Sequence, residues 1–179
     1  TSQVLSQQNK PVRWTTPSGF PVVQDYQTTR PGEAKIFLYD RAADKNRKRQ
    51  KLTFTVQQGK TDQKQSKSGI CANFVHSHDA AAMALCIVDL LDKGQSEDFM
   101  MIHDSFATSG DVWDLYHSVR HTFVEMYDDH CVFKAFQADI RRDLEHPSDL
   151  EKPKNKVPPI PAKGTLDLQG VKDSEFCFS

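Results

Sequence analysis

Hydrophobic and polar residues alternate in the first third of the chain and then change to a helical spacing. Near-alternate patterns rich in β-branched and aromatic residues predict three strands, over residues 20–26, 34–40 and 51–57. The dipeptide Pro31-Gly32 predicts a turn between the first two strands, and the run 41–50 predicts a longer connection before the third. The polar stretch 58–68 has no large apolar residue and predicts a mobile loop.

The spacing predicts a helix from Ala72 to Lys93, where apolar residues recur every three to four positions and Gly94 supplies a stop. Two short extended runs, 98–102 and 106–108, then enclose His103-Asp104-Ser105, which predicts a β-hairpin with a polar, acidic tip. Beyond the hairpin the pattern predicts two amphipathic helices, over 111–128 (with Asp111 as N-cap) and 132–146. A proline-rich extended linker is then predicted over 153–161.

These elements predict an α+β fold in which an antiparallel sheet with one hairpin packs on several helices. With 179 residues, the chain fits a single unit. We divide it into three parts. A strand-rich part with a basic loop covers residues 1–68, a part with the helices and the hairpin covers 69–149, and a C-terminal linker and end cover 150–179.

Composition excludes some classes of protein. A hydrophobic share of 37% with 11 Phe is enough for a core, which excludes a wholly disordered chain. The longest apolar run, Ala80 to Val88, is less than half of the about 20 residues that cross a bilayer, so we expect no membrane segment. The start, Thr1 to Val4, lacks the features of a secretory signal. The four Cys form no C-x-x-C pair, which predicts reduced thiols in an intracellular protein.

Charge is segregated along the chain. Residues 41–67 carry nine Lys and Arg against two Asp, whereas residues 89–149 carry fourteen acids against five bases. Such a basic cluster predicts salt-sensitive binding to nucleic-acid phosphates, with Arg47, Lys48 and Arg49 as the central contacts. The alternative is a solvated tip whose charges keep a strand edge from pairing.

Two groups of residues could carry chemistry. Asp104, at the tip of the hairpin, is placed to hold a metal, and its alternative is an ordinary turn residue. The sequence His76-Ser77-His78-Asp79 could open a zinc hydrolase site. In a helix, however, positions i and i+2 diverge by about 200°, so the two rings cannot share an ion. We expect His76 to face something specific and His78 to be solvated.

Five segments of the chain form an ordered set of motifs: Val12 to Val22, Ser68-Gly69 with Asn73 to Ser77, Ile102 to Phe106, Pro161 to Gly164, and the ending Phe176 to Ser179. In this order they resemble the C-terminal part of the single-subunit bacteriophage RNA polymerases and their mitochondrial relatives. Ala72, His78 and the Phe-Cys-Phe-Ser ending depart from the usual pattern of the family.

The resemblance implies the palm and part of the fingers of a polymerase with right-hand architecture. It implies that Asp104 binds both catalytic magnesium ions and that His76 approaches the minor-groove side of the primer-template end. It also implies that His103 contacts the nucleic acid and that the chain ends in a foot near the active site. The foot residues are Phe176, Phe178 and Ser179; plain core packing is the alternative for these aromatic residues.

The resemblance also implies what the complete enzyme works with. Its partners would be a DNA template, ribonucleoside triphosphates and the RNA product, in the cytoplasm of a phage-infected bacterium. The second catalytic Asp of the family lies upstream of anything that matches here, and the chain starts with Thr1. We therefore expect a segment of a longer nucleotidyltransferase, inactive and not retaining magnesium by itself.

Two rival interpretations remain. One is a DNA polymerase of the related single-chain class, whose hairpin reads His-Asp-Glu; Ser105 and the run Thr15 to Pro21 favour RNA synthesis instead. The other is a non-catalytic nucleic-acid-binding module built around residues 41–67.

Overall fold

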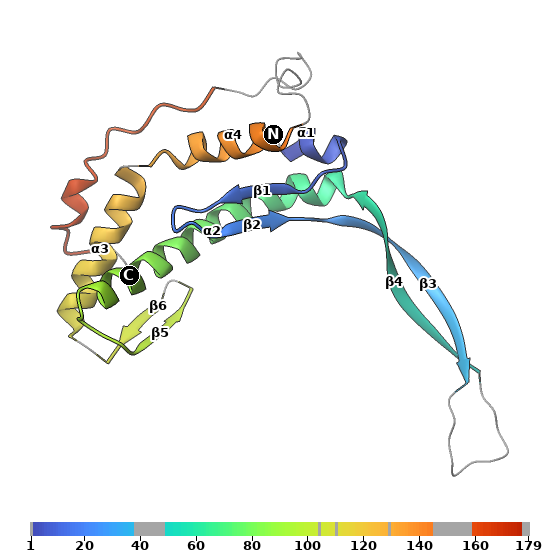
Figure 1. Cartoon of the computed structure of the whole chain (residues 1–179), viewed down its shortest axis with the longest axis horizontal. Coiled ribbons are helices and arrows are strands. Elements are labelled where there is room, and N and C mark those ends of the chain that lie inside the picture. Colours follow the sequence, from blue (N-terminus) through green and yellow to red (C-terminus); the bar gives the residue numbers. More distant parts are fainter. Residues whose placement is uncertain are drawn as a thin grey trace, which may run out of the picture.

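The computed structural model describes residues 2–37, 49–103, 105–109, 111–128, 130–144 and 159–176. A body of helices carries one long β-ribbon that projects away from it (Figure 1). The elements are α1 (Ser2–Gln7), β1 (Val12–Thr15), β2 (Pro21–Gln24), β3 (Gln27–Phe37), β4 (Arg49–Thr61), α2 (Gln63–Asp92), β5 (Phe99–Ile102), β6 (Ser105–Thr108), α3 (Val112–Asp128), α4 (Val132–Asp143) and the short 3-10 helix η2 (Gln169–Val171). The predicted α+β class is confirmed.

The described strands form three separate antiparallel pairs, β1–β2, β3–β4 and β5–β6. The prediction of one sheet was therefore wrong, because helices and the bend after β2 separate the pairs. The predicted turn at Pro31-Gly32 was also wrong. Both residues lie inside β3, opposite Thr55 and Phe54. Proline is tolerated on the free edge of a two-stranded ribbon, and a Cβ on Gly32 would lie 2.7 Å from the Phe54 ring.

The stretch 58–68 is a strand end and a helix start instead of a mobile loop. β4 continues to Thr61, and the Asp62 carboxylate caps α2 by accepting hydrogen bonds from the backbone N–H groups of Lys64 and Gln65, both at 3.0 Å. The first turns of α2 are polar because they are largely exposed, so no apolar periodicity marks them. As a result, α2 starts nine residues before the predicted position and crosses the boundary placed at residue 68.

The predicted end of α2 and the predicted start of α3 agree better with the structure. Gly94 adopts φ +64 after α2, and its N–H donates to the Leu91 carbonyl. The Asp111 carboxylate accepts a hydrogen bond from the Trp113 N–H at 2.8 Å, which confirms the N-cap of α3. α4 ends at Asp143, and residues 145–158, with most of the predicted linker, lie outside the described residues.

On length and composition alone, α2 meets the criterion for a membrane-spanning helix, with a mean hydropathy of 1.4 over 18 residues. The sequence analysis excluded a membrane segment because the unbroken apolar runs are short. That argument therefore does not apply to α2. Buried core helices of water-soluble proteins have the same length and composition; α2 packs against α1, β2 and α3, and 22% of this stretch is buried.

The main core holds β1 between α2 and α4. Trp14, only 2% exposed, packs its indole against the rings of Phe74 and Phe136, with centroids 6.1 and 5.8 Å away. Its Nε1 donates to the Ser77 Oγ at 2.9 Å. On the other side, the Asp139 carboxylate accepts from the Thr15 N–H at 2.8 Å. β1 therefore fixes both the rotation of α2 and the position of α4.

A second contact joins α2 to α3 through polar side chains. The Asp89 carboxylate accepts from the Ser118 hydroxyl and from Lys93, both at 2.7 Å. Burial raises the pKa of Asp89, but the hydrogen bonds from Lys93 and Ser118 outweigh it, so that the pKa lies below its ordinary value. Burial also raises the pKa of the neighbouring Cys86 thiol, which keeps this residue protonated and makes it a packing group.

The two tryptophans give a matched test of the main core. Trp14→Phe loses the hydrogen bond to Ser77 and leaves space beside Phe74, so we expect a loss of about 2 kcal/mol in the free energy of unfolding. Trp113 is 66% exposed, and Trp113→Phe should change this free energy by no more than about 0.5 kcal/mol. Urea unfolding followed by circular dichroism measures both; equal losses would show that Trp14 does not anchor the core.

Candidate active site

The predicted hairpin is present, and it presents its tip at the surface. Ile102 pairs with Ser105, which leaves His103 and Asp104 as the two-residue connection. His103 is exposed and adopts φ +55, a left-handed conformation that two-residue hairpin loops require and that histidine tolerates better than most residues. Asp104 lies outside the described residues, so its metal-binding role stays a prediction.

The base of the hairpin is fixed by a group of hydroxyls. The Thr108 hydroxyl donates to the Asp98 carbonyl at 2.9 Å and contacts the Ser96 hydroxyl, while the Ser109 hydroxyl donates to the Asp98 carboxylate at 3.1 Å. These bonds close the entry and exit of the hairpin, so its tip is carried on an anchored support.

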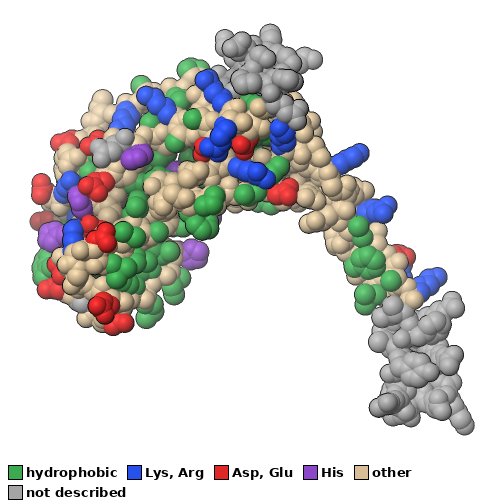
Figure 2. Space-filling view, viewed as in Figure 1, with side chains coloured by type: hydrophobic (Ala, Val, Ile, Leu, Met, Phe, Trp, Pro, Cys, Tyr) green, Lys and Arg blue, Asp and Glu red, His purple; other side chains and the backbone are tan. Residues whose placement is uncertain are grey.

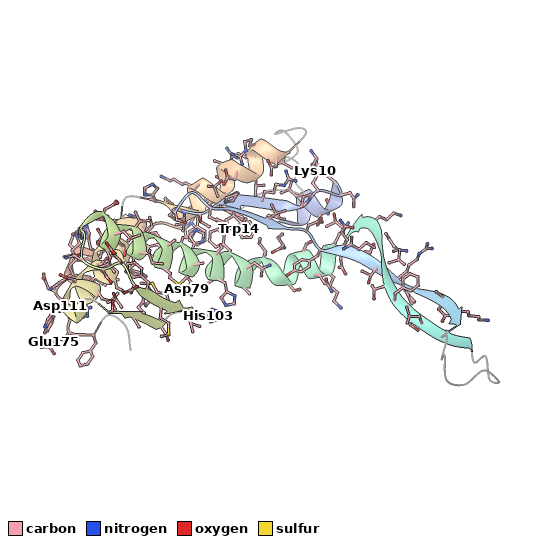
Figure 3. All side chains as sticks on the ribbon, turned by 60° about the horizontal axis from the view of Figure 1, so that its bottom comes forward. Lys10, Trp14, Asp79, His103, Asp111 and Glu175 are labelled. Atoms are coloured by element: carbon pink, nitrogen blue, oxygen red, sulfur yellow. The ribbon has the colours of Figure 1, made fainter. Side chains whose placement is uncertain are left out.

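One face of the hairpin lies over the helices. Phe106 of β6 borders a groove of about 140 Å³ together with Val75 and Asp79 of α2 and Tyr127 of α3. Burial raises the pKa of Tyr127, and the charge of Asp79 adds to this effect. Figure 3 shows the labelled Asp79 and His103 in the same region, on one side of α2. The helices therefore support the hairpin beside the middle of α2.

The Asn73 to Ser77 motif divides into residues that lock α2 and one that is left exposed. The Asn73 Nδ2 donates to the buried Gln24 Oε1 at 2.8 Å and to the Tyr26 hydroxyl at 3.1 Å, while Ser77 accepts from Trp14. The His76 ring is exposed, and it makes no side-chain hydrogen bond or ion pair within the described residues. The sequence analysis did not find these locking roles, although the motif itself contains the residues.

The prediction that His78 is solvated was wrong. Its ring is 5% exposed and lies 4.2 Å from the Phe74 ring, and its Nδ1 is 2.8 Å from the Phe74 carbonyl oxygen. His78 follows Phe74 by four positions, which places both rings on the core face of α2. His76 and His78 therefore differ in exposure, and across the described ranges no group of three or more His, Cys, Asp or Glu could hold a metal ion.

The basic residues are associated with the projecting ribbon. Arg47 and Lys48 lie outside the described residues, and Arg49 is the first residue of β4, where only the backbone is described. Along the ribbon, Lys51 pairs with Glu33 at 2.5 Å, with both side chains more than half exposed. On the face shown in Figure 2, Lys and Arg lie along the described part of the ribbon and also over the upper part of the helical body, while acids gather at the far end of that body.

Of the predicted foot residues, only Phe176 is described, and it is 87% exposed. Phe178 and Ser179 lie outside the described residues. Lys163, from the Pro161 to Gly164 motif, donates to the Asp128 carbonyl at the end of α3 at 2.8 Å. This motif therefore fastens the C-terminal segment to α3.

Comparison with known proteins decides the family. The model of the DNA-dependent RNA polymerase family matches residues 1–157. The chain belongs to this family. The chain is 35% identical to T7 RNA polymerase of Escherichia phage T7, over 94% of this chain and 18% of that protein. It is 31% identical to the mitochondrial DNA-directed RNA polymerase 1 of Nicotiana sylvestris, over 99% of this chain and 16% of that protein.

A third relative is DNA-directed RNA polymerase 1A of Nicotiana tabacum, 32% identical over 98% of this chain and 100% of that sequence. The chain therefore spans less than a fifth of the phage and mitochondrial relatives but all of this one. The resemblance inferred from the five ordered motifs is confirmed at the level of the family.

The left-handed residue of the hairpin tip can be tested with two substitutions at one position. Asn accepts positive φ more easily than other non-glycine residues, whereas a β-branched side chain is strongly disfavoured there. We expect His103→Val to lower the free energy of unfolding by about 1 kcal/mol or more relative to His103→Asn. Urea unfolding of the two variants measures the difference, and equal stabilities would mean that φ of residue 103 does not constrain the tip.

Proposed function

We propose that this segment is the palm part of a DNA-directed RNA polymerase and supplies the carboxylate of Asp104 to its active site. The main support is the hairpin: its two strands end in a two-residue tip, its base is anchored at Asp98, and its inner face lies against α2 and α3. A family member that positions one metal-binding acid needs such a support, because rigid strands place a turn residue accurately. The enzyme would transcribe a DNA template from ribonucleoside triphosphates.

Magnesium is the metal that this family implies. One hairpin carboxylate suits Mg²⁺, which binds to one or two carboxylates together with substrate phosphates. When bound, the metal supplies neutralisation of the charge on the phosphoryl group that is transferred. Asp104 would hold it from this segment, and a second carboxylate would come from the rest of the polymerase. We therefore expect the isolated 179-residue segment to make no RNA and to retain no magnesium.

His76 and His103 are proposed to contact the nucleic acid. His76 is exposed on α2, whose rotation is fixed by the bonds of Asn73 and Ser77 to neighbouring strands. His103 is exposed at the hairpin tip. Both rings belong to elements that border the same groove, so one primer-template end could meet both.

The ribbon is proposed as a second contact with DNA, through Arg47, Lys48 and Arg49. Its support is the ribbon's geometry: β3 and β4 extend away from the helical body, and the major groove of DNA admits a two-stranded ribbon (Figure 1). Lysines along it, such as Lys35 and Lys60, add positive charge that phosphates attract. As compartment we propose the cytoplasm of a phage-infected bacterium, since the phage relative is 35% identical and the mitochondrial one 31%.

Asp104→Asn in the polymerase that contains this segment tests the catalytic role. The change keeps the size and removes the charge that would hold the metal, so we expect template-dependent incorporation of ribonucleotides to fall on the order of 10³-fold or more. DNA binding should stay within about twofold, because the substitution removes no positive charge that contacts phosphates. Asp92→Asn, at an exposed position near the end of α2, is the control and should keep its activity. An Asp104 variant within tenfold of the wild-type rate would refute the assignment.

Salt dependence tests the ribbon. Each phosphate that a basic side chain neutralises contributes about 0.9 to the slope of log affinity against log salt. Replacing Arg47, Lys48 and Arg49 together by Gln should therefore flatten this slope by up to about 3. The matched control replaces three exposed bases of α4 by Gln, namely Lys134, Arg141 and Arg142. Fluorescence anisotropy with duplex DNA at several salt concentrations gives the slopes. If both triple variants keep the wild-type slope, the ribbon charges only protect a strand edge.

A further inference from the structure

The C-terminal segment, residues 159–176, runs along α3 in the opposite direction and is fastened at both ends (Figure 1). At the end of α3, Lys163 donates to the Asp128 carbonyl at 2.8 Å and Gln169 donates to the Asp128 carboxylate at 2.9 Å. Nearer the start of α3, Tyr116 and the mid-helix residue Arg120 hold the segment at Ser174. The path of the segment is therefore set by α3.

The fastening at Ser174 concentrates three donors on one carbonyl oxygen. The Tyr116 hydroxyl donates at 3.0 Å, and Arg120 donates through Nε at 3.3 Å and through Nη2 at 3.1 Å. The third nitrogen, Nη1, donates to the Tyr116 carbonyl at 3.2 Å, and the guanidinium lies 3.2 Å from the centre of the Tyr116 ring. All three guanidinium nitrogens of Arg120 therefore donate hydrogen bonds, and the guanidinium also lies over the Tyr116 ring.

The burial of Arg120 makes this arrangement unusual. Its side chain is 5% exposed, and no carboxylate in the described part of the chain lies within ion-pair distance of it. A buried cation is costly unless nearby groups replace its hydration, and here a carbonyl dipole and an aromatic face do so. An apolar side chain would satisfy the packing of α3 at lower cost. The packing of α3 therefore does not explain the guanidinium of Arg120, whereas its hydrogen bonds to the C-terminal segment do.

We call the bonds from Tyr116 and Arg120 to the Ser174 carbonyl the clamp. The clamp is also connected to the residues that follow Ser174. The Ser174 hydroxyl donates to the Phe176 carbonyl at 3.0 Å, so the turn that presents Phe176 to solvent starts at the clamped residue. Arg120 therefore acts on Phe176 through two consecutive hydrogen bonds.

We propose that Arg120, together with Tyr116, is a positioning residue for the C-terminal segment: it fixes the point and the direction in which Phe176 leaves α3. The importance of this direction for RNA synthesis rests on the proposed function, together with the foot at the active site that the family resemblance implies for Phe176. The clamp itself does not depend on that function, so the two can be tested separately.

Hydrogen exchange measured by mass spectrometry tests the clamp on the polymerase that contains this segment. In Arg120→Gln, a peptide covering residues 165–176 should exchange at least about tenfold faster than in the wild type, because two hydrogen bonds to Ser174 are lost. Arg120→Lys should give an intermediate rate, since an ammonium keeps the charge but not the fork. Arg141→Gln, at an exposed position on α4, should give the wild-type rate.

A peptide from α3 itself shows whether the helix unfolds. If Arg120→Gln also accelerates exchange in the α3 peptide, the Tyr116→Phe variant distinguishes loss of the clamp from unfolding of the helix. This variant removes one hydrogen-bond donor to Ser174 and keeps the ring. It should accelerate exchange of residues 165–176 by about fivefold and leave α3 unchanged. Wild-type exchange of residues 165–176 in both Arg120→Gln and Tyr116→Phe would overturn the proposal.

A double-mutant cycle then tests the link to catalysis. Phe176→Ala removes an exposed ring and leaves the fold undisturbed. If Arg120 acts through Phe176, Arg120→Gln lowers kcat about 10- to 100-fold in the wild-type background and causes little further loss in the Phe176→Ala background. Losses that multiply would overturn the link. A wild-type polymerase without RNA synthesis would refute the proposed function instead, while the exchange rates still decide the clamp.

Discussion

The packing of Trp14 between two helices is the constraint on which the rest of the structure depends. Its indole contacts Phe74 of α2 and Phe136 of α4, and its N–H is bonded to Ser77. Because β1 also holds α4 through Asp139, three elements far apart in sequence share one anchor. A rotation of α2 about its axis would break the bond to Ser77, and the exposed position of His76 follows from this fixed rotation.

The other functional elements are placed relative to α2. The hairpin lies against its middle through Phe106, and the ribbon leads into its N-terminus at Asp62. At its far end, Asp89 holds α3 through Ser118, and α3 in turn carries the clamp on Ser174. The proposed catalytic tip, the proposed DNA-binding ribbon and the end of the chain are therefore connected through one 30-residue helix.

Local signals in the sequence predicted the parts of the fold that local chemistry determines. Gly94 and Asp111 mark helix ends through their own conformation and hydrogen bonds, and the hairpin at 99–108 follows from two short extended runs around a polar tip. The errors occurred where tertiary contacts decide. Gly32 reads as a turn residue but is required by the Phe54 ring, and the strand β1 (Val12–Thr15) is too short to show a pattern. His78 reads as polar but is buried by its contact with Phe74.

The candidate site divides in the same way. The resemblance pointed to His76 and Asp104, which are defined by motifs. Arg120 and Tyr116 belong to no motif, and their role arises only because the segment around Ser174 returns to α3, more than fifty residues later in the chain. Such long-range partners leave no periodic signal, so only the folded structure could reveal them.

The central claim, that the tip of the β5–β6 hairpin holds the catalytic metal, can be tested by replacing Mg²⁺ with Fe²⁺ in the polymerase that contains this segment. With ascorbate and peroxide, bound Fe²⁺ generates hydroxyl radicals that cut the backbone close to the metal. We expect cuts within residues 102–105 that disappear when excess Mg²⁺ is added. Cleavage of the polymerase that Mg²⁺ suppresses, but that leaves residues 99–108 intact, would contradict the claim.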